Sequence, residues 1–148
     1  MTQRLSRAEA PTHETWRLED LFPTAESWQS ELDATLADIA SVAVFRGRLA
    51  EGAVTLLGCL EATEQLMMRM LRVGTYAYLR FSEDGSSPIN QGMMGRVSSA
   101  QAQIGAAIAF LQPEILALPD GTVERYLQEE PRLAPFGRRL EQILSNKP

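Results

Sequence analysis

Apolar residues recur at helical spacing along most of the chain and predict three long helices. The first is expected over residues 25–44, where four apolar residues are spaced by four, four and three: Trp28, Leu32, Leu36 and Ile39. The second is expected over residues 52–82 and carries a longer stripe: Leu56, Leu60, Met67, Leu71, Tyr78 and Phe81. The third is expected over residues 88–111, with one face formed by Met93, Val97, Ile104, Ile108 and Leu111.

No stretch of the sequence sustains the apolar–polar alternation of a half-buried strand. The fold class predicted is therefore all-α, an antiparallel helical bundle with long helical hairpins. Residues 1–15 are polar and are expected to form a flexible N-terminal lead-in. Residues 16–148 are expected to form a single helical domain.

Local signals place the ends of these helices. Thr24 is suited to cap the first helix, and Gly47 to end it with a left-handed conformation. Ser87 can cap the third helix, with Pro88 at its first position. Two shorter helices should follow, one capped by Asp120 and one that carries four apolar residues: Phe136, Leu140, Ile143 and Leu144.

The third helix is unusual because most positions outside its apolar face are small. Gly92, Gly95 and Gly105 fall in its interior, together with many alanines and serines. A glycine inside a helix costs roughly 1 kcal/mol relative to alanine, so these positions need a reason in packing. We expect a tight contact between this helix and another.

Charge and composition exclude several classes of function. The net charge is −5, with scattered arginines and a single lysine, which argues against nucleic acid as a partner. The N-terminus lacks the apolar core of a signal peptide, and no apolar stretch reaches the roughly 18 residues of a membrane span. A membrane is therefore not expected as a partner, and the cytoplasm is the expected location. One cysteine, Cys59, cannot form an internal disulfide.

The sequence contains no recognisable catalytic or cofactor motif. His13 is the single histidine, and Cys59 is expected to be a small buried apolar residue, so a zinc site lacks ligands. No His-Glu-x-x-His, nucleophile elbow or phosphate-binding loop occurs. No catalytic residue, metal ligand or cofactor-binding residue is predicted in this chain.

Two tyrosines late in the second helix are candidates for an exposed role. Tyr76 and Tyr78 point to different faces of the helix, so that one of them can line a groove. Together with Arg72 they are the residues that we expect to face a channel or an interface. Ordinary core and interface packing is the alternative for both tyrosines.

Several short strings together resemble the N-terminal region of oligoendopeptidase F-type zinc metallopeptidases, which are similar to thimet oligopeptidase. The strings span residues 16–22 with Trp28, then residues 45–49, 76–78, 110–115 and 146–148. Their order covers residues 16–148, although each string alone is weak. The resemblance implies a later domain in which His-Glu-x-x-His and a downstream Glu bind zinc.

That catalytic domain is absent here, so the chain alone is predicted to be inactive, with zinc expected only in the missing domain. The resemblance implies that the helices form one wall of a channel that admits short peptides. The partners would be the catalytic C-terminal domain and short peptides, and an exposed apolar patch should remain where the rest of the enzyme packs. The alternative is a stand-alone helical interaction module, a homodimer formed through the third helix.

Overall fold

The structure is a computed structural model that describes residues 9–147, without the side chain of Glu14. Its described residues form helices and no strand, which confirms the all-α prediction. The α-helices are α1 (Ala25–Ala37), α2 (Ile39–Ala43), α3 (Ala53–Glu83), α4 (Pro88–Ile108), α5 (Leu111–Leu116), α6 (Thr122–Glu129) and α7 (Gly137–Leu144). Single turns or short runs of 3-10 helix are η1 (Thr12–Glu14), η2 (Leu18–Asp20), η3 (Leu49–Glu51) and η4 (Pro131–Phe136).

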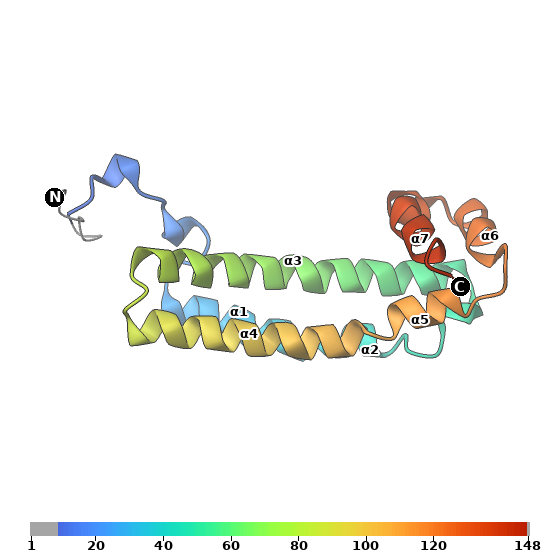
Figure 1. Cartoon of the computed structure of the whole chain (residues 1–148), viewed down its shortest axis with the longest axis horizontal. Helices are drawn as coiled ribbons and strands as arrows, with labels where there is room; N and C mark the ends of the chain where they lie inside the picture. Colours follow the sequence, from blue (N-terminus) through green and yellow to red (C-terminus); the bar gives the residue numbers. More distant parts are fainter. Residues whose placement is uncertain (1–8, 148) are drawn as a thin grey trace.

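A long antiparallel hairpin of α3 and α4 forms the body of the molecule (Figure 1). Helices α1 and α2 pack along the back of this hairpin, and α5, α6 and α7 gather at one end of it. Trp28 of α1 is buried against α3, where its indole Nε1–H donates to the carbonyl of Val73 at 2.9 Å. The core therefore lies between three helices along the hairpin, and the C-terminal helices extend it at one end.

The predicted helix caps at Thr24 and Ser87 are confirmed. The Thr24 side chain accepts from the backbone of Ser27, and the Ser27 side chain accepts from the backbone of Thr24. The Ser87 side chain accepts from the Asn90 backbone, with Pro88 at the start of α4. These caps satisfy amide groups that have no partner inside the helix.

Two local predictions are wrong. The helix expected over residues 25–44 is divided at Asp38, because Ser41 donates both its backbone N–H and its hydroxyl to the Asp38 carbonyl and tightens the turn. Asp120 does not cap α6, which begins after Gly121 in a left-handed conformation. The Asp120 carboxylate pairs instead with Lys147.

The predicted lead-in, residues 1–15, falls partly outside the described residues, which begin at residue 9. Within its described part, Thr12–Glu14 form the turn η1. The predicted domain over residues 16–148 extends one residue past the described chain. None of the helices within residues 9–147 combines the length and hydropathy of a membrane span.

Candidate functional site

One apolar stripe of α3 is covered along its first half and open along its second. Leu56 and Leu60 are completely buried at the end of α3 that contacts α6 and η4. Farther along the same stripe, Leu71 is 70% exposed and Tyr78 is 60% exposed. In Figure 1 the helices α6 and α7 lie only beside the beginning of α3, at the right of the view. The predicted stripe is therefore buried at its beginning and exposed beyond Leu60.

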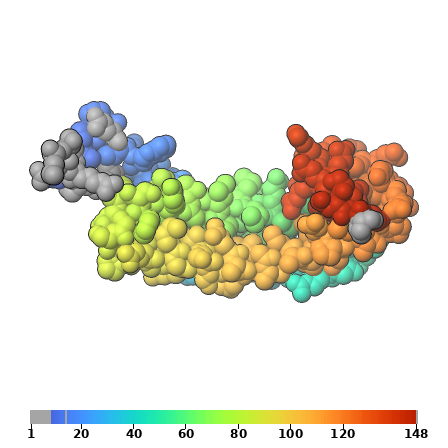
Figure 2. Space-filling view, viewed as in Figure 1, coloured from blue at the N-terminus to red at the C-terminus, as the bar shows by residue number. Residues whose placement is uncertain are grey.

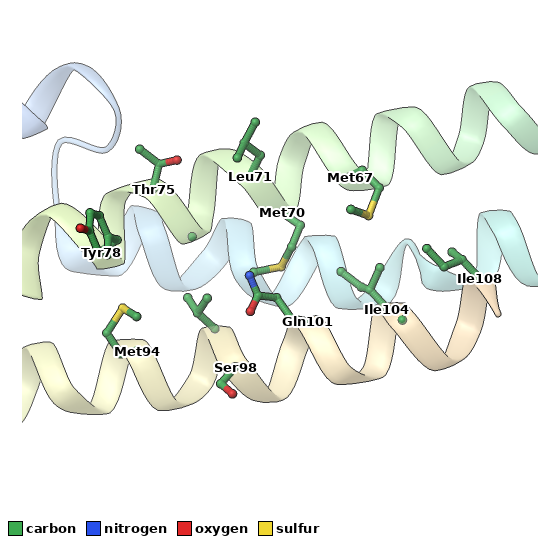
Figure 3. Close-up of a pocket in the computed structure, with 13 residues that line it drawn as sticks. Met67, Met70, Leu71, Thr75, Tyr78, Met94, Ser98, Gln101, Ile104 and Ile108 are labelled. Carbon is green, nitrogen blue, oxygen red and sulfur yellow. The ribbon is translucent and has the colours of Figure 1, made fainter. Parts of the chain in front are cut away.

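The open half of α3 borders a groove shared with α4, which we call the α3–α4 groove. Its volume is about 730 Å³. Figure 3 shows the thirteen residues that line it: Met67, Met70, Leu71, Gly74, Thr75, Tyr78, Met94, Val97, Ser98, Gln101, Ile104, Gly105 and Ile108. The groove lies on the face of the hairpin turned away from α1, since the close-up shows α1 behind it.

The groove has a buried floor and an exposed rim. Met70, Val97 and Ile104 are buried and form the floor. In Figure 3 the Met70 side chain extends from α3 toward Gln101 of α4, whereas Leu71 points away from α4. The exposed rim is formed by Met67, Leu71 and Tyr78 of α3 and by Ser98, Gln101 and Gly105 of α4.

The chemistry of the groove suits an apolar partner surface and not catalysis. None of the thirteen described lining residues is charged, and their polar groups are hydroxyls and one amide. An uncharged groove of this size can bury apolar side chains and orient them with a few hydrogen bonds. It contains no carboxylate, imidazole or thiol that could transfer a proton or attack a substrate.

The three predicted site residues separate in the structure. Tyr78 is exposed on the α3–α4 groove, whereas Tyr76 is buried on another face of α3. The Tyr76 ring meets the Phe22 ring edge-on, with centroids 5.4 Å apart. Arg72 lies over the same Phe22 ring at 4.6 Å and donates to the Leu21 carbonyl at 2.6 Å. Tyr76 and Arg72 thus hold the segment before α1 against α3, and Tyr78 alone of the three lines the groove.

Sequence reasoning missed the α4 side of the groove, including Met94 and Gln101. A signal was present, because α4 has a single charged residue, Arg96, over residues 88–108. The Arg96 guanidinium donates a hydrogen bond to the Gln29 side chain of α1, so it lies on the side of α4 that faces α1 and not on the groove. A long, partly exposed helix with so little charge is typical of an element that packs on both sides.

At the three interior glycines of α4 the expected tight contact is not found within the described chain, although Ala100 of the same helix is completely buried. A Cβ added at Gly92, Gly95 or Gly105 would meet no atom within 4 Å. A glycine that does make a helix contact is Gly74 of α3, where a Cβ would lie 3.6 Å from the Cγ1 atom of Val97. The packing of this chain on itself therefore does not explain the glycines of α4.

Metal-binding groups do not converge in the described structure. Over residues 9–147, no three His, Cys, Asp or Glu side chains are close enough to hold a metal ion. Cys59 is fully buried on α3, and burial raises the pKa of its thiol to about 11. The described residues therefore offer no preformed zinc site.

Comparison with known proteins relates the chain to one family. Residues 114–148 match the family described as oligopeptidase F. Oligopeptidase PepF of Bacillus subtilis (strain 168) is 31% identical over 142 residues, which are 96% of this chain and 21% of the relative. The chain corresponds to the N-terminal region of oligoendopeptidase F-type peptidases.

Other relatives and structures agree with this placement. Group B oligopeptidase PepB of Streptococcus agalactiae is 27% identical over 133 residues, 90% of this chain and 22% of the relative. The crystal structure of oligoendopeptidase F from Enterococcus faecium superposes with a TM-score of 0.75 at 23% identity, over 84% of this chain and 24% of that one. A proposed peptidase from Chlamydophila abortus gives a TM-score of 0.81 at 17% identity, over 98% of this chain and 24% of that chain. These structures share the fold, and the chain spans about a fifth of the length of the curated relatives.

Proposed function

We propose that this chain is the N-terminal helical wall of a zinc oligoendopeptidase that cleaves short peptides. In this role the helices limit access to an internal channel and support the catalytic domain. The observation that carries the proposal is the match to PepF of Bacillus subtilis along 142 residues, which are only 21% of that protein. Most of the relative's length thus corresponds to nothing in this sequence.

The groups available in the chain fit a supporting role. The sequence holds one histidine and no His-Glu-x-x-His, so both the zinc and the general base would belong to the catalytic domain. Tyr78 is the residue we propose for contact with a peptide or a neighbouring domain, because its ring is exposed on an uncharged groove. Hydrolysis of short peptides by such an enzyme would take place in the cytoplasm.

Complementation between two polypeptides tests this proposal. The chain would be mixed with the part of Bacillus subtilis PepF that lies outside the matched region, and cleavage of a short quenched-fluorescent peptide would be measured with added zinc. We expect cleavage from the mixture and none from the chain alone. Failure of the two polypeptides to bind, measured by calorimetry, would argue against a wall domain.

A stand-alone interaction module without catalytic activity is the second candidate function. The observation that favours it is the open, uncharged α3–α4 groove, since monomers rarely leave contiguous apolar surface without a partner. A partner that covers this groove without any gain in peptide cleavage would support the module over the peptidase wall.

A further inference from the structure

The open half of the α3 stripe continues a surface that is covered at its other end. Leu56 and Leu60 are buried where α3 contacts α6 and η4. Met67, Leu71 and Tyr78 follow on the same side of the helix, spaced by four and seven, and are exposed. Short helices of this chain thus form a layer over the first part of the stripe, and Figure 2 shows no such layer over the second part. The open half is suited to receive an element of the same kind.

The groove beside this open half has the length and shape for one helix. Figure 3 shows Tyr78 across from Met94 toward one end and Met67 across from Ile104 toward the other. The α4 side runs from Met94 to Ile108, roughly 20 Å or about four helical turns. A helix laid along the groove can place apolar residues into it at every third or fourth position.

The lining of the groove sets the chemistry of the partner. Met67, Met70 and Met94 line it, and methionine side chains adapt to the shape of an apolar surface placed on them. A Cβ added at Gly105 would meet no atom within 4 Å, so a partner side chain can approach the backbone there. No described lining residue is charged, and a charge buried against this lining would therefore be unpaired and costly. The face that fits is apolar and uncharged.

The area of the groove argues against a second copy as its occupant. A length of roughly 20 Å and a width of roughly 20 Å for two adjacent helices give a footprint of about 400 Å². Two copies joined there would bury about 800 Å² in total, less than the roughly 1,200–2,000 Å² of specific, stable interfaces. Domains of one polypeptide associate through about 600–1,500 Å², since their linkage supplies a high effective concentration. The footprint therefore fits a contact between two parts of one polypeptide.

The relatives of this chain are polypeptides of that kind. The matched residues are only 21% of PepF of Bacillus subtilis, so most of that protein lies outside the matched region. The same fold occurs in the solved chain from Enterococcus faecium, of which it makes up 24%. In such a chain, further elements are held close to the hairpin by covalent linkage and are available to cover it.

We propose that the α3–α4 groove is the surface on which the remaining part of a zinc oligoendopeptidase docks, through a helix with an uncharged, apolar face. The side chains of this helix pack between the α3 and α4 sides of the groove and cover Leu71 and Tyr78. The inference rests on the proposed function and deepens it, because it names the surface that attaches the wall to the rest of the enzyme.

Cysteine labelling in a hybrid enzyme tests the docking. The hybrid carries this chain in place of the matched region of Bacillus subtilis PepF, so that both parts belong to one polypeptide. Leu71→Cys on the groove and Ile89→Cys outside it are a matched pair, because Leu71 is 70% exposed and Ile89 is 71% exposed. Cys59 is fully buried, and peptide mapping separates its labelling from that of the introduced thiols.

The labelling rates separate the docking from the proposed function. In the chain alone, the two introduced thiols should label at similar rates. In the hybrid, Leu71→Cys should label about tenfold more slowly than Ile89→Cys or slower still, because only opening of the contact exposes it. Equal labelling of both positions in a hybrid that cleaves peptides would overturn the docking and leave the proposed function intact. Protection at position 71 in a hybrid that cleaves no peptide would support the docking and count against the proposed function.

Binding between two separate polypeptides is the second measurement, which also serves if the hybrid does not fold. Leu71→Glu and Ile89→Glu change the net charge of the chain equally, and both variants should keep its melting temperature. Leu71→Glu should weaken binding of the remaining part of PepF by about tenfold or more, as for a central interface residue, and Ile89→Glu by much less. Equal effects of the two substitutions would overturn the docking.

Two other occupants of the groove would each overturn the proposal. A second copy would show in sedimentation of the chain alone, as a mass that rises from 16.4 kDa toward twice that value and stays at 16.4 kDa with Leu71→Glu. A short peptide substrate would show as protection of Leu71→Cys that appears only when the peptide is added to the hybrid. We expect neither result.

Discussion

Trp28 joins α1 to α3 through both its ring and its indole N–H. The ring is 1% exposed, and the N–H donates to the Val73 carbonyl across 45 residues of sequence. Trp28→Phe should lower the free energy of unfolding by about 1–3 kcal/mol, because a hydrogen bond and part of the packing are lost. Denaturation in urea measures this change. Trp16→Phe, at a position that is 76% exposed, is the control and should change stability by less than about 0.5 kcal/mol.

Cys59 is expected to be unreactive while the chain is folded. Burial raises its pKa from 9.0 to about 11, and only the thiolate is a good nucleophile. A thiol reagent at pH 8 should label the chain in denaturant and leave the native chain unlabelled. Rapid labelling of native chain would show that this part of α3 is open.

The same thiol gives stability a pH dependence with a defined sign. Its contribution is fully present below pH 9.0, where the thiol is protonated in both the folded and the unfolded chain. As the pH rises from 9.0 toward about 11, the unfolded chain loses this proton first, so the free energy of unfolding should fall. Cys59→Ala should remove this part of the alkaline dependence.

At the residue scale the sequence predicts what depends on near neighbours. The Thr24 and Ser87 caps and the burial of Cys59 were predictable because each depends on type and position within one helix. The failure of Asp120 to cap α6 was not predictable, because its carboxylate pairs with Lys147, which lies 27 positions away in the sequence.

Two glycines, one inside a helix and one in a turn, give opposite predictions for stability when replaced by alanine. Gly92 lies within α4, and a Cβ there meets nothing within 4 Å, so Gly92→Ala should raise the free energy of unfolding by up to about 1 kcal/mol. Gly47 has a φ of +77°, which residues with a Cβ adopt at an energetic cost. Gly47→Ala should therefore lower the free energy of unfolding by about 1–2 kcal/mol. Thermal unfolding followed by circular dichroism measures both. Loss of stability on Gly92→Ala would mean that α4 is packed more closely there than described.

Periodicity identifies which residues of an element share a face, but not how far that face is covered. Leu60 and Tyr78 belong to one stripe of α3, yet the first is buried and the second is 60% exposed. The difference arises because the C-terminal helices reach only one end of α3, which no pattern within residues 53–83 records. For the same reason the groove was predictable only as far as the expectation that one of the two tyrosines, Tyr76 or Tyr78, lines a groove.

At the scale of the whole molecule, one face of the α3–α4 hairpin is left largely uncovered. Figure 2 shows the C-terminal helices standing at one end of the α3–α4 hairpin, while the rest of this face has no further layer over it. The all-α bundle and the relation to oligoendopeptidase F were both predictable from sequence. The surface that a partner would cover was not, because it depends on where the packing of the described chain ends.

Methionine methyl resonances measured while the remaining part of Bacillus subtilis PepF is added test the central claim, that the α3–α4 groove is a surface through which this chain contacts the rest of a peptidase. Met67 and Met94 line the groove, whereas Met93 is buried and does not line it. The methyl signals of Met67 and Met94 should move as the second polypeptide is added, and that of Met93 should stay nearly constant. Signals of Met67 and Met94 that do not change although the two polypeptides bind would contradict the account.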